Sequence, residues 1–217
     1  MKKNLTELVF ILDKSGSMGG LVSDTIGGYN AMLEKQQAVD GECHITTALF
    51  DDTYELLHDR IDIRAVRPIT TNEYFVGGST ALLDAIGMTI QKIANAQKHT
   101  AEEYRAEKVI FIIITDGLEN ASRSYSSDMI KSLIERQKMK YGWEFIFLGA
   151  NIDSVRTARN IGIQQDRAVD YVADSEGVKL KYATMNNAVA EFREKATISD
   201  QHFETLREDV KKRGNRK

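Results

Sequence analysis

The fold of this chain is decided by the stretch Leu8-Val9-Phe10-Ile11-Leu12-Asp13-Lys14-Ser15-Gly16-Ser17. It begins with an unbroken apolar run, which is typical of a central strand covered on both faces. Two further runs of this kind follow, from Val109 to Ile114 and from Phe145 to Leu148. Continuous apolar strands indicate a mostly parallel sheet in the interior of the protein.

An antiparallel hairpin is predicted at one edge of this sheet. The segments from Ile45 to Phe50 and from Tyr54 to Ile63 flank the turn residues Asp51-Asp52. A pair of strand-like runs separated by such a short polar turn is the usual pattern of a hairpin. The segment from Ala168 to Val172 is the candidate for a short last strand, which brings the expected number of strands to six.

Between the strands the apolar residues recur at helical spacing. The stripes that predict helices are Val22, Ile26, Tyr29 and Leu33; Leu83, Ile86, Ile90 and Ile93; Ile130, Leu133 and Ile134; Val155 to Ile161; and Val178, Tyr182, Met185, Val189 and Phe192. A final amphipathic helix carries Phe203, Leu206 and Val210, and Ser199 is expected to cap it.

Alternating strands and helices predict an α/β fold. We expect a Rossmann-like, doubly wound, mostly parallel six-stranded sheet with one antiparallel edge strand and helices on both faces. Residues 1–197 are expected to form this domain, and residues 198–217 a C-terminal helical extension with a basic tail. The tail, Lys211-Lys212-Arg213-Gly214-Asn215-Arg216-Lys217, is expected to be solvated.

Composition narrows the classes of function. The net charge of the 217 residues is -3, so the chain has no broad cationic field with which to bind a nucleic-acid backbone. Its single cysteine, Cys43, rules out a framework of internal disulfides. We find neither a signal peptide nor an apolar stretch that could span a membrane. These features predict a cytoplasmic protein whose partners are neither membranes nor nucleic acids.

Three polar loops follow or face the apolar strands. They contain Asp13-x-Ser15-x-Ser17 after the first run, Thr80 in Gly77-Gly78-Ser79-Thr80, and Asp116 in Thr115-Asp116-Gly117. Ligands of open α/β sheets bind beyond the carboxyl ends of the strands, where these loops are expected to meet. Carboxylate and hydroxyl oxygens suit Mg²⁺, Mn²⁺ or Ca²⁺ better than zinc or copper. Gly16 and Gly19 are expected to allow the sharp backbone path that brings the side chains together.

A simpler alternative is that these residues cap helices, and Thr80 before Ala81-Leu82-Leu83 has the right position for a cap. Capping explains each loop separately but not all three together. Other polar residues on the same rim are candidates either for a partner surface or for ordinary loop contacts: Glu119, Asn120, Arg123, Asn151 and Asp153.

Taken together, the Asp-x-Ser-x-Ser triplet, Thr80 and the strand-ending Asp116 resemble the metal-ion-dependent adhesion site (MIDAS) of the von Willebrand factor A (VWA) domain family, in its stand-alone intracellular form. The resemblance covers about residues 5 to 195. It implies that Ser15, Ser17 and Thr80 contact the metal, and that Asp13 and Asp116 do so directly or through water. It also implies that an acidic side chain of a protein partner completes the metal's coordination shell.

The resemblance further implies a binding module, not an enzyme. Intracellular proteins of this family often act as adaptors for AAA-type ATPases or belong to bacterial and phage stress or defence gene sets, so such a complex is the expected partner. The alternative is a Mg²⁺-dependent phosphoryl-transfer hydrolase of haloacid-dehalogenase-like layout. That layout needs a second aspartate two residues after the first, where this chain has Ser15, and a lysine that the neighbouring loops do not offer.

Overall fold

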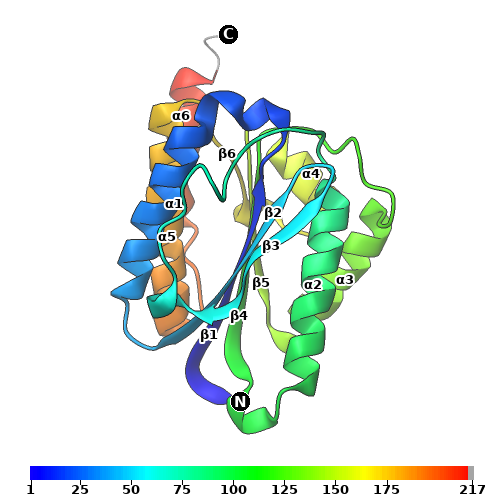
Figure 1. Cartoon of the computed structure of the whole chain (residues 1–217), viewed down its shortest axis with the longest axis vertical. Coiled ribbons are helices and arrows are strands. Elements are labelled where there is room, and N and C mark those ends of the chain that lie inside the picture. The colour runs from blue at the N-terminus through cyan, green and yellow to red at the C-terminus, as the bar shows by residue number, and fades with distance from the viewer. Residues whose placement is uncertain (215–217) are drawn as a thin grey trace.

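Six strands form a single sheet in the order β3-β2-β1-β4-β5-β6 in the computed structural model, which describes residues 1–214 (Figure 1). The strands are β1 (Lys2–Asp13), β2 (Glu42–Phe50), β3 (Tyr54–Asp62), β4 (Ala106–Thr115), β5 (Glu144–Gly149) and β6 (Ala168–Asp170). All neighbouring strands are parallel except β2 and β3, which are antiparallel. The predicted fold class, including the antiparallel edge strand, is confirmed.

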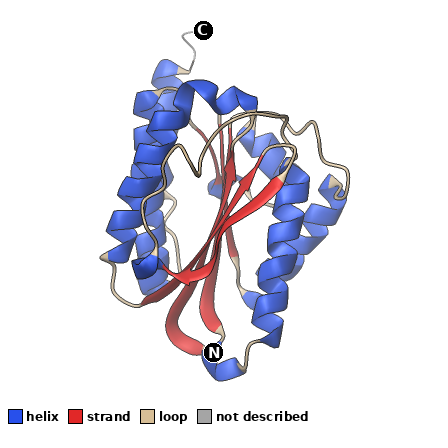
Figure 2. Ribbon diagram, viewed as in Figure 1, coloured by secondary structure: helices blue, strands red, loops and turns tan. Residues whose placement is uncertain are grey.

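Helices cover both faces of the sheet (Figure 2). They are α1 (Val22–Gln37), α2 (Leu82–His99), α3 (Ser127–Tyr141), α4 (Ser154–Asn160), α5 (Ser175–Lys195) and α6 (Gln201–Arg213). Helices α1, α5 and α6 pack on one face, and α2, α3 and α4 on the other. Among residues 1–214, no helix combines the length and apolar character that crossing a bilayer would require.

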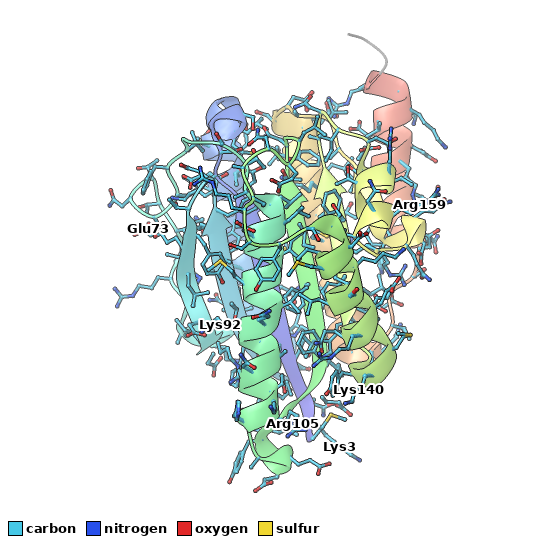
Figure 3. The ribbon with its side chains drawn as sticks, turned by 90° about the vertical axis from the view of Figure 1, so that its right-hand side faces the viewer. Lys3, Glu73, Lys92, Arg105, Lys140 and Arg159 are labelled. Carbon is cyan, nitrogen blue, oxygen red and sulfur yellow. The ribbon has the colours of Figure 1, made fainter. Side chains whose placement is uncertain are left out.

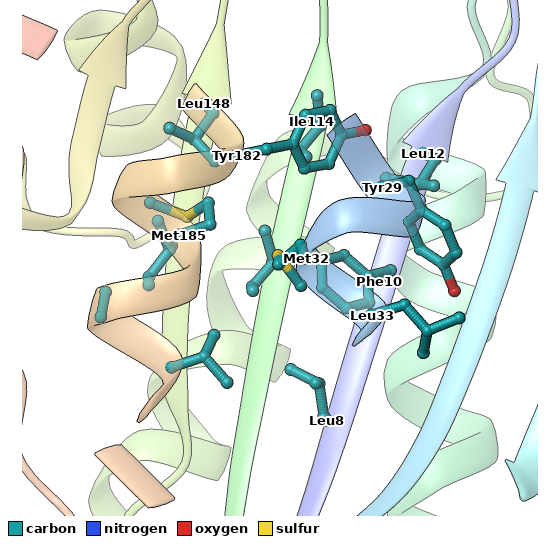
Figure 4. Packing of buried hydrophobic residues seen from close by; sticks show 14 of the residues in the cluster. Leu8, Phe10, Leu12, Tyr29, Met32, Leu33, Ile114, Leu148, Tyr182 and Met185 are labelled. Carbon is teal, nitrogen blue, oxygen red and sulfur yellow. The ribbon is translucent and has the colours of Figure 1, made fainter. Parts of the chain in front are cut away.

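The two-sided burial of β1 explains its unbroken apolar run. Leu8, Phe10 and Leu12 point into the core beneath α1 and α5, where Phe10 meets Tyr29 edge-on with ring centroids 5.6 Å apart (Figure 4). Val9 and Ile11 point into the second core, beneath α2 and α3. Successive side chains of a strand alternate between faces, so a strand that is covered on both sides is apolar at every position.

The edge strand β3 is much less buried than the central strands, as its polar sequence requires. Lys92 on α2 forms an ion pair of 2.7 Å with Asp59 on β3, on the side of the molecule that Figure 3 shows. The charged, half-exposed edge limits pairing with a further strand.

The C-terminal helix α6 is part of the core. Phe203 and Leu206 are fully buried in the same cluster as α5. The helix begins at Gln201, directly after Asp200, whose side chain makes no capping hydrogen bond. The Ser199 hydroxyl accepts a hydrogen bond of 3.3 Å from the backbone N–H of Gln201, so the predicted capping by Ser199 is confirmed.

The predicted basic tail divides between two regions. Its residues 211–213 lie in the last turn of α6, where Arg213 forms an ion pair with Asp174. Gly214 is the C-cap of α6, and residues 215–217 of the predicted tail lie outside the described residues.

The central strands β1 and β4 lie side by side, with Leu12 opposite Ile114. The chain leaves β1 toward α1 on one face and leaves β4 toward α3 on the other. Since the two connections diverge, the strand order reverses at the carboxyl ends of β1 and β4, which is where open α/β sheets bind their ligands.

Candidate metal centre

Asp13 is the last residue of β1 and is almost completely buried, with 1% of its surface exposed. Its Oδ1 accepts a hydrogen bond of 2.7 Å from the backbone N–H of Ser15. Its Oδ2 accepts a hydrogen bond of 2.6 Å from the hydroxyl of Thr115, the last residue of β4. Both oxygens are therefore held in place before any ligand arrives.

Ser15, Ser17 and Asp116 form a chain of polar contacts beside Asp13. The two serine hydroxyls lie 3.0 Å apart, and Ser17 Oγ donates a hydrogen bond of 2.5 Å to Asp116 Oδ1. Asp116 follows β4 directly, so its carboxylate reaches the site from the neighbouring strand.

The hydroxyl of Thr80 comes from the third loop. A Cβ atom added to Gly117 would lie 3.3 Å from Thr80 Oγ1 and 3.4 Å from Ser17 Oγ, so both hydroxyls border the same small space. Helix α2 begins at Leu82 with Ala81 as N-cap, and the N–H groups of Leu83 and Asp84 in its first turn donate to Glu119 and Ser122. The alternative role for Thr80 as a helix cap is therefore wrong, and its hydroxyl borders the same space as that of Ser17.

Backbone contacts lock the three loops together. Gly16 N–H donates to Gly78 O at 3.2 Å, and Gly77 N–H donates to Lys14 O at 2.9 Å. Among these loops the left-handed backbone occurs at Gly78, with φ of 66°. The expectation that Gly16 and Gly19 make the sharp turn is thus wrong, because both lie in a right-handed 3-10 turn, Gly16–Leu21.

Residues that the sequence did not single out support the site from behind. Tyr74, fully buried, donates from its hydroxyl to the carbonyl oxygen of Asp13 at 2.6 Å. Thr115 was quoted within a motif, but only the structure shows that its hydroxyl orients Asp13. No sequence signal distinguishes Tyr74, because it lies in the irregular segment between β3 and α2.

Three of the five polar residues on the rim make hydrogen bonds within the fold. Glu119 accepts hydrogen bonds from the backbone N–H groups of Leu83, Ala121 and Ser122, and Asn120 Oδ1 accepts one of 2.9 Å from Thr80 N–H. Asp153 is the N-cap of α4. For these three residues the ordinary structural role is confirmed. Asn120 contributes indirectly, since it fixes the backbone of Thr80.

Burial raises the pKa of Asp13 above its ordinary value, although hydrogen bonds from Ser15 and Thr115 oppose the shift. Burial likewise raises the pKa of Asp116, against the hydrogen bond from Ser17. Two carboxylates in a site of low water content are costly to keep ionised unless a positive charge lies near them. The site therefore favours a cation.

The donor set fits a hard divalent cation. It offers two carboxylates and three hydroxyl groups, all oxygen donors, from Asp13, Asp116, Ser15, Ser17 and Thr80. In residues 1–214 there is no group of three or more His, Cys, Asp or Glu side chains arranged to hold a metal. At this site hydroxyl groups would therefore add to the two carboxylates, and a six-coordinate ion needs water or an outside ligand as well.

A second group that the sequence analysis missed is Lys181 on α5. It is completely buried, and its Nζ has no hydrogen-bond partner among the described residues. The sequence contains a signal that Lys181 is buried. It lies three residues after Val178 and four before Met185, within the apolar stripe of the helix.

Comparison with known proteins identifies the fold. No protein-family model matches the sequence, and no curated protein matches it. Among solved structures, the manganese-loaded TRAP protein of Plasmodium vivax aligns with a TM-score of 0.59 and 19% identity over 82% of this chain and 72% of that one. Proximal thread matrix protein 1 of the mussel byssus, with a zinc-occupied MIDAS motif, aligns with a TM-score of 0.57 and 15% identity over 85% of this chain and 46% of that one.

A von Willebrand factor type A protein from Catenulispora acidiphila aligns with a TM-score of 0.55 and 13% identity over 85% of this chain and 42% of that one. The chain spans less than half the length of this protein and of the mussel protein. The fold of the chain is that of a VWA domain.

Proposed function

We propose that this protein is a divalent-metal-dependent protein-binding module that recognises an acidic side chain of its partner. One observation carries the proposal: five oxygen-bearing side chains from three loops converge at the carboxyl ends of β1 and β4. They are Asp13, Ser15, Ser17, Thr80 and Asp116. A solved structure with the same fold is described as manganese-loaded, and another has zinc in its MIDAS motif.

The chemistry of the donors favours Mg²⁺ as the cellular ion, with Mn²⁺ or Ca²⁺ as alternatives, because all the side-chain ligands are hard oxygens. When bound, the metal supplies a Lewis-acidic position to which a carboxylate from outside can bind. The chain's own contribution is to orient Asp13 through Thr115 and Ser15, and to hold Thr80 through Asn120. A preorganised site of this kind loses little entropy when a ligand binds.

The partner proposed is an AAA-type ATPase or a stress or defence complex, for which this cytoplasmic protein would act as an adaptor. The resemblance of the metal motif to that of intracellular adaptors supports this choice. An acidic loop on the partner would bring the carboxylate that completes the coordination shell.

The phosphoryl-transfer alternative gains one feature from the structure, because Lys181 lies close enough to Asp13 for their charges to interact. The chain lacks the other features that a phosphoryl-transfer enzyme of this layout needs. Position 15 is a serine and cannot act as a general acid in the way an aspartate does. Lys181 is completely buried and cannot reach a phosphoryl group from solvent. We therefore propose binding, without catalysis.

The test is a pull-down with tagged wild-type protein in Mg²⁺ and in excess chelator, with the retained proteins identified by mass spectrometry. We expect an acidic partner to be retained only with Mg²⁺, and to be lost with Thr80→Ala. Thr100→Ala is the matched control, because Thr100 follows α2 at the opposite end of the sheet. A partner that is recovered equally with and without chelator would contradict the proposal.

A further inference from the structure

Lys181 is a buried cation without an ordinary partner. Its side chain projects from α5 into the core, where it is completely buried, and its Nζ makes no hydrogen bond to any described residue. A fully buried ammonium group is costly because it loses its hydration, so buried lysines are nearly always paired. The Lys181 ammonium therefore needs a stabilising interaction other than a hydrogen bond.

Two aromatic rings lie against its Nζ, and the charges of two carboxylates act on it. The Nζ lies 4.1 Å from the ring centroid of Tyr171 and 4.8 Å from that of Tyr182, both within the range of cation–π attraction. The charges that act on it are those of Asp116 and Asp13. Burial lowers the pKa of Lys181 to about 7, and the two carboxylates oppose that shift. Burial holds the pKa of Tyr171 and of Tyr182 above the ordinary value, so both phenols remain neutral.

The same two carboxylates are the charged members of the metal centre. The formal charge of Asp13 and Asp116 exceeds that of the Lys181 ammonium by one negative unit. Arrival of a divalent cation would therefore leave the centre with a net positive charge while the ammonium is present. The centre would be neutral if the ammonium were absent. A residual positive charge opposes entry of the metal and favours a further anion.

We propose that the buried Lys181 ammonium is a fixed counter-charge beneath the metal centre, which weakens capture of the metal and strengthens the attraction of the bound metal for a carboxylate from the partner. Lys181 is a positioning residue that touches neither ligand. The inference rests on the metal site of the proposed function. It adds that selectivity for an acidic partner depends on a charge that lies behind the site.

Binding of the metal and binding of the proton to Lys181 affect each other by the same factor. If the ammonium weakens metal binding by some factor, the metal must lower the affinity of Lys181 for its proton by the same factor. Metal affinity of the wild-type protein should therefore rise as the pH increases through about 7, where the ammonium loses its proton. Because protonation of Asp13 and Asp116 also affects metal binding, the contribution of Lys181 is isolated by substitution.

The test compares wild type with Lys181→Met at about pH 6.5, below the depressed lysine pKa but well above ordinary carboxyl values. Mn²⁺ affinity is measured by calorimetry. Acetate is then titrated onto the Mn²⁺-loaded proteins, and its binding is followed by loss of the water-proton relaxation that manganese-bound water causes. Metal-free protein provides the blank.

We expect Lys181→Met to bind Mn²⁺ roughly tenfold more tightly and acetate several-fold more weakly, in line with typical coupling between sites. Loss of packing alone would not move the two affinities in opposite directions. Lys179→Met, an exposed lysine on the same helix, should change neither affinity. Lys108→Met removes a buried lysine from the other end of β4 and should also change neither.

A second measurement uses the wild-type protein alone and so does not depend on the folding of the variant. The ε-methylene NMR signal of Lys181 should shift toward that of the neutral form when Mg²⁺ is added. Unchanged affinities in Lys181→Met, or a lysine signal that ignores Mg²⁺, would overturn the inference. Absence of metal binding in every protein would overturn the metal site and the inference together. Metal-independent partner capture would contradict only the proposed function.

Discussion

The hydroxyl of Thr115 donates a hydrogen bond of 2.6 Å to Oδ2 of Asp13, and so ties the end of β4 to the end of β1. Thr115 is completely buried, so water cannot replace this contact. Since Oδ1 is held by Ser15 N–H, the contact of Oδ2 with Thr115 fixes the rotation of the carboxylate. A residue that touches no ligand therefore shapes the metal centre.

Thr115→Val should weaken metal binding. Valine has nearly the same shape but cannot donate a hydrogen bond, so Oδ2 of Asp13 loses its orienting partner. Loss of such a supporting contact typically lowers metal affinity roughly 10- to 100-fold. Calorimetric titration with Mn²⁺ measures the effect. Thr115→Ser, which restores the hydroxyl, should recover most of the affinity, and equal affinity in wild type and Thr115→Val would contradict the role of the contact.

Metal titration of chelator-treated protein should reveal about one site for Mg²⁺ or Mn²⁺. Asp13→Ala and Thr80→Ala should each abolish or greatly weaken binding, because they remove a carboxylate and a hydroxyl from the same small space. Circular dichroism should show that both variants remain folded. Thr100→Ala serves as the control and should bind as wild type does. Undiminished binding by Asp13→Ala would show that the metal binds elsewhere.

No phosphatase activity is expected with p-nitrophenyl phosphate and Mg²⁺. The nucleophile of such an enzyme would be Asp13, but Ser15 stands where the general acid is needed, and the leaving group would receive no proton. The assay should give the same background rate for wild type and Asp13→Asn. Turnover that disappears in Asp13→Asn would establish the enzyme and displace the binding function.

Gly28→Ala should destabilise the protein by about 1–3 kcal/mol, because the space at this position is already filled. A Cβ atom on Gly28 would lie 2.2 Å from Cδ2 of Tyr182, so α1 and α5 would have to separate. For a domain of this size, 1 kcal/mol lowers Tm by roughly 2–4 °C.

The neighbouring glycine provides the control for that change. A Cβ atom on Gly27 would meet nothing within 4 Å, so Gly27→Ala should be neutral or stabilise α1 by up to about 1 kcal/mol. Thermal unfolding of the two variants makes the comparison. Equal Tm values for Gly27→Ala and Gly28→Ala would show that the contact between α1 and α5 is looser than the structure indicates.

Much of the fold follows from local patterns. The unbroken apolar runs around Leu8–Leu12 and Val109–Ile114 predict central strands, since only a strand covered on both faces lacks polar positions. The polar turn at Asp51-Asp52 predicts the antiparallel edge, which the pairing of β2 with β3 confirms. Ser199 before the last apolar stripe predicts a helix cap, and the hydrogen bond that its hydroxyl accepts from Gln201 N–H confirms it.

The sequence by itself determined that Asp13, Ser15, Ser17 and Asp116 stand at or just beyond the ends of two apolar strands, and that Thr80 precedes a helix. It could do so because the position of a residue after an apolar run is a one-dimensional property. Only the tertiary structure decided how Thr115 holds Asp13, and that Lys181 lies behind them, because these relationships join residues from different strands and from α5. In the sequence, its place within an apolar stripe indicates that Lys181 is buried, but not which groups lie near it. Its charge affects the metal centre only because folding removes its water and brings two carboxylates within range of electrostatic interaction.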